Sequence, residues 1–248
     1  MPPRARVALE PAYLLHQRAW RDSSRIIEFL TREHGLVVLF AKGVRRPGSR
    51  LAAVLQPFVP LYLSWSGSGD GGTLTGAEPE ASATALSAAR VLGGFYLNEL
   101  LLRLLAREDP HPRIYAAYRQ ALAGLAEHAG GARALRLFEK QLLEALGFGV
   151  DYGHLAGSGA PLARDEYYHV IAEQGVVGSC RAQAPEAYLG AELLSLAHEE
   201  LADAASLASA RRLLQAALVG PLDGRELSSP GVARALRAQR TGRGDPRP

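Results

Sequence analysis

The chain has 248 residues, of which 48% are apolar and 21% are charged, and its formal net charge at pH 7 is +3. These values are ordinary for a globular protein and exclude wholesale disorder, while the length only weakly favours two domains over one. A single cysteine, Cys180, excludes an intramolecular disulfide and favours a reducing compartment. The first residues, MPPRARVALEP, lack the apolar core of a secretory signal, so we expect a cytoplasmic protein.

The charge is unevenly distributed along the chain. Residues 1–50 hold ten Lys and Arg against four Asp and Glu, a net charge of +6, which leaves −3 for the remaining residues. Because a concentrated positive field attracts polyanions, the N-terminal part is where we expect a nucleic acid to bind.

Apolar runs separated by turn residues fill the first 80 residues and predict strands. We expect them at 4–15, with a bend at Glu10-Pro11, at 26–30 and 36–41 as a hairpin, at 51–65, and at 73–78. The uncharged stretch 51–69 contains two prolines and is read as a strand with breaks, so no membrane span is expected. About five strands without intervening helices predict a small barrel, and the pattern leaves an OB-fold and an SH3-like barrel equally open.

A basic loop follows the predicted hairpin. Four cations lie within nine positions, and the glycines and prolines between them end the strand and expose the segment. Together with two arginines of the hairpin, the candidate phosphate-binding residues are Arg25, Arg32, Lys42, Arg45, Arg46 and Arg50. The alternative is a solvated loop whose charges only keep the protein soluble. Aromatic side chains of the barrel could stack on bases, but most should belong to the core, and the pattern singles out none of Tyr13, Trp20, Phe29, Phe40, Phe58, Tyr62 and Trp65.

From residue 79 the apolar period changes from two to about 3.6, which predicts helices. We expect them from Ser82 or Ser87 to 109, at 114–128, at 132–146, at 185–205 and at 206–218, with a shorter one at 230–237. Glycine-rich loops with a small hairpin should fill 149–184, and the tail 239–248 should be disordered.

No catalytic motif is present in the chain. It has no phosphate-binding loop ending in Gly-Lys-Ser/Thr, no Gly-x-Ser-x-Gly and no paired acidic cluster suited to magnesium, so we expect neither a catalytic residue nor a cofactor.

Several motifs in order resemble the RecO family of bacterial DNA repair proteins. They are Asp22-Ser23-Ser24-Arg25-Ile26-Ile27, Thr31-Arg32-Glu33-His34-Gly35, Ala41-Lys42-Gly43-Val44-Arg45-Arg46, Phe95-Tyr96-Leu97-Asn98-Glu99-Leu100-Leu101, Phe138-Glu139 with Leu146-Gly147-Phe148, and Pro221-Leu222 with Arg225-Glu226-Leu227. The resemblance implies an α+β fold, with a five-stranded OB-fold barrel at 1–79 followed by a larger α-helical domain at 80–238.

The resemblance also implies a function. It is that of a non-enzymatic recombination mediator, cytoplasmic and nucleoid-associated, which binds single- and double-stranded DNA and the single-strand DNA-binding protein SSB. Such a protein anneals complementary strands and works with RecR to load RecA. A nucleic-acid hydrolase with an unrecognised site and an RNA-binding module remain as alternatives, which cleavage assays and DNA-versus-RNA competition would distinguish.

In RecO-like proteins the helical domain receives the acidic, apolar-ended C-terminal tail of SSB. A cationic stripe at helical spacing, Arg133, Arg136 and Lys140, is the candidate for that role, with Arg136 as the first choice to bind the terminal carboxylate. The alternative is an ordinary solvent-facing helix edge.

RecO proteins often carry a four-cysteine zinc site after the Leu-Gly-Phe segment. In this chain the equivalent region has no Cys-x-x-Cys, and the other candidate ligands, His154, His169 and Cys180, are one short of the four that a structural zinc requires. We therefore expect no zinc.

Overall fold

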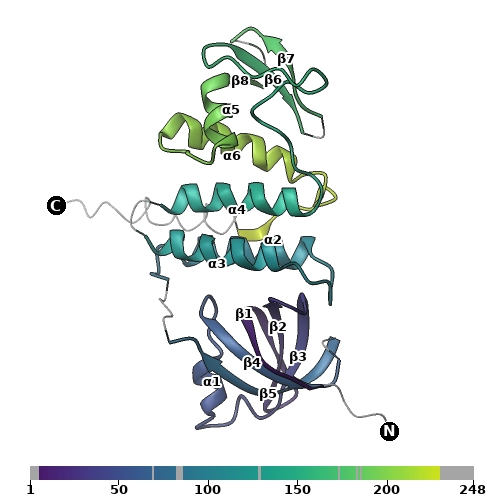
Figure 1. Cartoon of the computed structure of the whole chain (residues 1–248). Helices are drawn as coiled ribbons and strands as arrows, with labels where there is room; N and C mark the ends of the chain where they lie inside the picture. The colour runs from purple at the N-terminus through teal and green to yellow at the C-terminus, as the bar shows by residue number, and fades with distance from the viewer. Residues whose placement is uncertain are drawn as a thin grey trace, which may run out of the picture. The chain divides into compact units, whose positions relative to one another are not determined.

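A computed structural model describes residues 6–68, 70–81, 86–127, 130–172, 174–182, 184 and 186–229. The chain divides into two compact units, Met1–Ala126 with Glu226–Pro248, and Glu127–Arg225. Figure 1 shows strands in the first part of the chain and mainly helices after it. The α+β class is thereby confirmed.

The first unit contains a closed five-stranded barrel. Its strands are β1 (Arg6–Trp20), β2 (Ser24–Thr31), β3 (Leu36–Ala41), β4 (Pro60–Ser66) and β5 (Asp70–Pro79). They close in the order β1-β2-β3-β5-β4, with β3 and β5 parallel and the other neighbours antiparallel. This order and the parallel closure are those of an OB-fold, which confirms the predicted barrel and decides against the SH3-like alternative.

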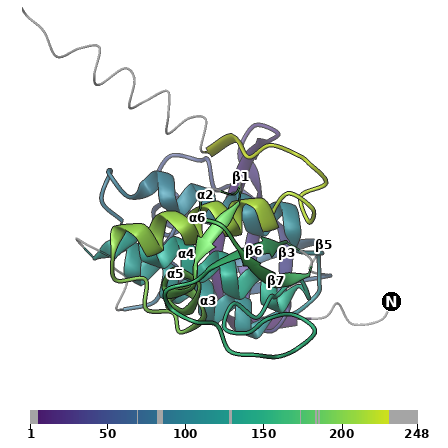
Figure 2. The same cartoon turned by 90° about the horizontal axis from the view of Figure 1, so that it is seen from above.

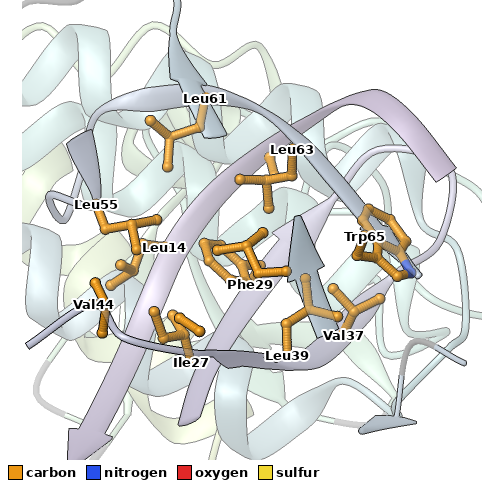
Figure 3. Packing of buried hydrophobic residues seen from close by; sticks show 13 residues of the cluster. Leu14, Ile27, Phe29, Val37, Leu39, Val44, Leu55, Leu61, Leu63 and Trp65 are labelled. Atoms are coloured by element: carbon orange, nitrogen blue, oxygen red, sulfur yellow. The ribbon is translucent and has the colours of Figure 1, made fainter. Parts of the chain in front are cut away.

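Alternate side chains of these strands fill the barrel. Figure 3 shows side chains from every side of it meeting in the centre, including Leu14 of β1, Phe29 of β2 and Leu63 of β4. Trp65 closes part of this core and is only 2% exposed. A small barrel needs such large side chains because its interior has to be filled without voids.

Strand β1 departs twice from regular pairing. Leu14 lies opposite Phe29 while His16 lies opposite Glu28, the next residue of β2, so Leu15 is an extra residue in β1. A second bulge separates Val7 from Glu10. Leu14 faces the core, whereas His16 pairs with Glu28 at 3.2 Å on the outer surface.

Part of the strand predicted at 51–65 is helical instead. Helix α1 (Arg50–Val54) begins at Ser49, whose side chain accepts a hydrogen bond from the Ala52 N–H, and β4 begins only at Pro60. An N-cap serine satisfies backbone donors that would otherwise be unpaired at the start of a helix. The uncharged, apolar composition of the segment concealed this signal.

Two helices of the first unit pack on the barrel, α2 (Val91–Leu104) and α3 (Pro112–Ala126). The Asn98 side chain of α2 donates a hydrogen bond from Nδ2 to the Leu15 carbonyl at 2.8 Å. Its Oδ1 accepts a hydrogen bond from the Tyr118 hydroxyl of α3 at 2.6 Å. The Tyr118 ring meets Tyr13 of β1 edge-on at 5.0 Å. These helices belong to the same compact unit as the barrel, so the boundary between the two units does not coincide with the predicted domain boundary near 79–80. The predicted domain limits stay a prediction.

The second unit combines helices α4 (Gly131–Ala145), α5 (Gly190–Ala197) and α6 (Ala204–Ala217) with a three-stranded sheet. The sheet has the order β7-β6-β8, with β6 at Tyr167–Ile171, β7 at Gly175–Cys180 and β8 at Ala187–Leu189. Both views show α5 beside α6 (Figures 1 and 2).

The hairpin expected within 149–184 is therefore present as β6 and β7, but the helix predicted from residue 185 begins only at Gly190. The residues before it pair with β6, where Tyr188 lies opposite Tyr168 and both rings are buried. Gly190 allows the backbone of Ala163 to pack closely against the start of α5, since a Cβ at this position would lie 1.9 Å from the Ala163 carbonyl oxygen. The predicted helix at 230–237 and the predicted disordered tail at 239–248 lie outside the described residues.

Candidate nucleic-acid interface

The basic loop, residues 42–50, runs from the end of β3 to the start of α1 and is fastened to the β1–β2 turn. The Arg45 backbone N–H donates to the Ser23 carbonyl at 2.9 Å, and Arg45 Nη1 donates to the Arg21 carbonyl at 3.3 Å. Gly43, with φ of +69°, turns the chain so that the Arg46 N–H reaches the Gly43 carbonyl at 3.1 Å. Backbone hydrogen bonds thus order the loop.

The cations of the loop point to solvent. Lys42, Arg45, Arg46 and Arg50 are all exposed. Arg25 lies close by on β2, opposite Ala41, and its guanidinium is half-buried and donates to Gln17 Oε1 at 2.7 Å. Five of the six predicted phosphate-binding residues therefore gather at one end of the barrel.

Arg32 lies apart from these five. It follows the last residue of β2, seven positions beyond Arg25, and an extended strand of that length covers about 23 Å. Its guanidinium pairs with Glu33 at 2.8 Å. The structure does not bring Arg32 together with the basic loop.

Two further arginines of β1 and its turn belong to the same end of the barrel and were missed from the sequence. Arg18 lies opposite Ile26 and is exposed, and Arg21 is in the turn to which Arg45 bonds. The signal was the alternation of His16, Arg18 and Trp20, which marks one face of a strand. Asp22 is the acidic residue of the turn. We call the cluster Arg18, Arg21, Arg25, Lys42, Arg45, Arg46 and Arg50 the basic end.

The second predicted site, on α4, consists of cations that already have partners within the second unit. Arg133 donates to the carbonyls of Glu199 and Glu200 at 2.6 and 2.8 Å. Arg136, the first choice to bind the tail carboxylate, is buried, and its Nη2 donates to Oε1 of Glu139 at 2.6 Å. Within the described residues, Arg136 Nη1 is buried and has no hydrogen-bond acceptor.

Lys140 lies beside a small hollow of the second unit. Its ammonium pairs with Glu144 at 2.9 Å and with Glu199 at 3.0 Å. Burial by itself lowers the pKa of Lys140, but the hydrogen bonds to Glu144 and Glu199 outweigh it and raise the pKa above its usual value. Lys140 and Glu144 line the hollow together with Leu143, Phe148, Gly149, Val150, Tyr152 and Leu214.

The candidate zinc ligands do not form a cluster. His154 pairs with Asp151 at 2.9 Å, His169 lies in β6 opposite Gly178, and Cys180 lies at the end of β7. Over the described ranges, no three His, Cys, Asp or Glu side chains gather as a metal site would require. The expectation of no zinc stays a prediction.

No helix among the described residues is long and apolar enough to cross a bilayer.

Comparison with known proteins connects both halves of the chain to one family. Residues 7–83 match the family model described as "Recombination protein O N terminal", and residues 86–229 match "Recombination protein O C terminal". The chain is similar to the DNA repair protein RecO of Nitrosococcus oceani, with 41% identity over 94% of this chain and 95% of that protein. It is also similar to those of Methylococcus capsulatus, with 39% identity over 92% and 97%, and Haemophilus influenzae, with 38% identity over 90% and 97%.

Proposed function

Because the chain belongs to the RecO family of DNA repair proteins, which are non-enzymatic recombination mediators, we propose that it binds single- and double-stranded DNA through the basic end of its barrel. On this proposal the helical part binds the tail of SSB, and the protein anneals complementary strands and promotes RecA loading together with RecR. It does so in the cytoplasm, associated with the nucleoid.

The observation that carries DNA binding is the attachment of the basic loop to the β1–β2 turn through Arg45. The attachment brings cations of two separate segments to one end of a barrel whose fold commonly binds nucleic acid. Phosphates neutralised by such side chains release counterions, which drives binding and makes it dependent on salt. Because phosphates occur in both forms of DNA, this interaction serves single and double strands alike.

A pair of single charge reversals tests the proposal. Arg45→Glu should weaken DNA binding and flatten the plot of log affinity against log salt by roughly one for each phosphate that the variant no longer neutralises. Arg32→Glu is the matched control, because it makes the same change of charge at the end of β2 that lies away from the basic end. It should alter the DNA affinity and the salt slope less than Arg45→Glu does. Arg45→Glu/Arg46→Glu should enlarge the effect.

Fluorescence anisotropy with labelled single and double strands at several salt concentrations measures both quantities. A folded double variant with the slope of the wild type would refute DNA binding at the basic end. Equal effects of Arg45→Glu and Arg32→Glu would show that the field of the whole barrel, and not this cluster, attracts DNA.

For the SSB tail, the support is the chemistry around α4. A tail with a terminal carboxylate and apolar last side chains needs a cation beside an apolar surface. Lys140 lines the small hollow together with apolar side chains such as Leu143 and Leu214, and Arg136 Nη1 has no hydrogen-bond acceptor within the described residues. Arg133 lies on the same helix.

Titration of a labelled tail peptide tests this role. Loss of a charge-assisted hydrogen bond from Arg136 should lower tail affinity about tenfold or more and leave DNA affinity unchanged. Since Glu139 would be left without Arg136, the Arg136→Met/Glu139→Leu variant is the better choice, because it removes the cation together with its partner. Arg136→Lys should recover only part of the binding, since an ammonium lacks the planar fork of a guanidinium.

Lys140→Ala should weaken tail binding independently. Wild-type affinity in all of these variants would mean that the tail binds elsewhere. Pull-down with SSB that has or lacks its last residues, and with RecR, tests the partners themselves.

A further inference from the structure

Trp20 is an exposed aromatic residue at the basic end. It is the last residue of β1, lies opposite Ser24 and is 39% exposed. The other tryptophan, Trp65, is in the barrel core and 2% exposed. Large apolar side chains do occur singly on surfaces, so exposure alone assigns no role to Trp20.

The neighbours of Trp20 make it part of a patch. Its ring centroid lies 6.1 Å from that of Phe40 on β3, and Phe40 lies opposite Ile26 of β2 on the outer face. Phe40 itself is half-exposed, and Ile26 is buried although it does not belong to the barrel core. These three residues, from three adjacent strands, form what we call the aromatic patch.

A glycine keeps one side of the patch open. Gly71 of β5 has φ of +105° and lies between the residues that pair with Val38 and Leu39, so its backbone bulges next to Phe40. A Cβ at Gly71 would lie 3.7 Å from the Phe40 ring. No side chain from this position covers the ring.

Cations surround the patch. The Arg21 guanidinium carbon lies 6.0 Å from the centre of the Trp20 ring, and Arg45 donates to the Arg21 carbonyl. Arg18 lies on the same strand face as Trp20, two residues before it. An aromatic surface bordered by arginines combines the two contacts that a single strand offers, a base to stack on a ring and a phosphate to bind a cation.

We propose that Trp20, supported by Phe40, stacks on unpaired bases, so that the basic end distinguishes single-stranded from duplex DNA. This inference rests on the proposed binding of DNA at the basic end. It adds that the arginines bind phosphates and that Trp20 binds unpaired bases. In a duplex the bases are stacked on each other and are closed to Trp20, whereas the phosphates remain accessible to the arginines. The cations therefore hold either form, and Trp20 adds affinity only for bases that are free.

The two tryptophans make the stacking directly measurable. Oligo(dT) should quench the fluorescence of the wild-type protein through Trp20, while a duplex of equal length should quench it little. In Trp20→Phe the remaining emission comes from the buried Trp65, and quenching should disappear while single-strand affinity is largely kept, because a phenyl ring still stacks.

Trp20→Ala should lower single-strand affinity about five- to tenfold, the lower range for one base on one aromatic ring, and leave duplex affinity unchanged. Tyr62→Ala is the matched control. Tyr62 is an aromatic residue of similar exposure, 37%, on β4 of the same barrel, but it lies opposite Glu78 and away from the basic end. Its loss should change neither affinity.

The outcomes separate this inference from the proposed function. If Trp20→Ala lowers single-strand and duplex affinity equally, or if saturating oligo(dT) leaves wild-type fluorescence unchanged, Trp20 stacks on no base, although DNA binding by the arginines stands. If the wild type binds neither form of DNA, the proposed function itself fails. Equal losses in Trp20→Ala and Tyr62→Ala would also overturn the role of Trp20.

Discussion

Arg136 and Glu139 form an ion pair that is buried inside the second unit. Arg136 Nη2 donates to Glu139 Oε1 at 2.6 Å, and the two side chains are 8% and 0% exposed. They lie three residues apart on α4, a spacing that places both on one face of the helix. A pair so far from water gains attraction but also carries a large desolvation penalty.

Arg136→Ala should therefore lower the free energy of unfolding by about 3–5 kcal/mol, because it leaves the Glu139 carboxylate buried without its guanidinium. Arg136→Met/Glu139→Leu should recover most of that loss, since it removes both charges and keeps apolar volume. Urea unfolding followed by circular dichroism measures each value, with Arg133→Ala, an exposed cation of the same helix, as the control. A double variant as unstable as Arg136→Ala would contradict the account.

Glu99 of α2 should make stability depend on pH. Its carboxylate accepts hydrogen bonds from the N–H groups of Ser228 and Ser229, at 2.8 and 2.9 Å, and from the Ser229 hydroxyl at 2.6 Å. Burial alone would raise the pKa of Glu99, but these bonds and the nearby Arg103 outweigh it and lower the pKa below its usual value.

Because the folded-state pKa of Glu99 is lowered, its contribution is fully present above the unfolded-state value of about 4.3 and is lost as pH falls through the folded-state value. Glu99→Gln should reduce stability by about 1–2 kcal/mol at pH 7, and the difference from wild type should shrink at acidic pH. Thermal unfolding of both proteins across pH 3–7 measures it. A constant difference over that range would show that the charge of Glu99 contributes nothing.

Adjacent glycines of α2 should respond differently to the same substitution. A Cβ at Gly94 would lie 2.6 Å from the Phe58 ring, whereas one at Gly93 would lie 2.9 Å from a terminal methyl of Leu125. Gly94→Ala should destabilise the protein by about 1–3 kcal/mol through overpacking against a rigid ring. Gly93→Ala should be nearly neutral, because the gain in helix propensity offsets a small shift of the methyl group. Equal unfolding midpoints for the two variants would argue against the packing of Gly94 on Phe58.

Zinc should be substoichiometric in protein prepared without a chelator, and a chelator should not change the melting temperature. Inductively coupled plasma mass spectrometry and differential scanning fluorimetry provide the two measurements. One tightly held zinc per chain would show that His154, His169 or Cys180 takes part in a site with further ligands. Hydrogen bonds within residues 149–184 would then be only part of what stabilises this segment. One of them is the bond that the Tyr168 hydroxyl accepts from the Ala163 N–H at 2.8 Å.

Much of the barrel was predictable from the sequence, because β2 and β3 consist of apolar runs bounded by turn residues. Helix α1 and strand β8 were not, since both are short: α1 has only the Ser49 cap as a local signal, and β8 forms by pairing with β6, which lies at a distance along the chain. Local pattern carries little information on elements of this length.

The candidate sites were predictable to different degrees. Charge density alone located the basic loop, but the separation of Arg32 from it depends on which end of β2 each residue occupies. For Arg136, helical spacing correctly placed it beside Arg133 and Lys140. The same spacing could not reveal that the Arg136 guanidinium is buried in an ion pair with Glu139, because burial depends on what packs against α4.

The extra residue in β1, Leu15, acts as a phase shift in the strand. Before it the even-numbered residues Ala12 and Leu14 point into the barrel, and after it the even-numbered residues Arg18 and Trp20 point outward. If Leu15 were paired as a regular residue of the ladder instead of being bulged, the alternation would turn Arg18 and Trp20 toward the interior. The carbonyl of this bulged residue is also the one that Asn98 binds. The bulge at Leu15 thus determines which side chains of β1 are available to a ligand, and it anchors the strand to α2 at the same point.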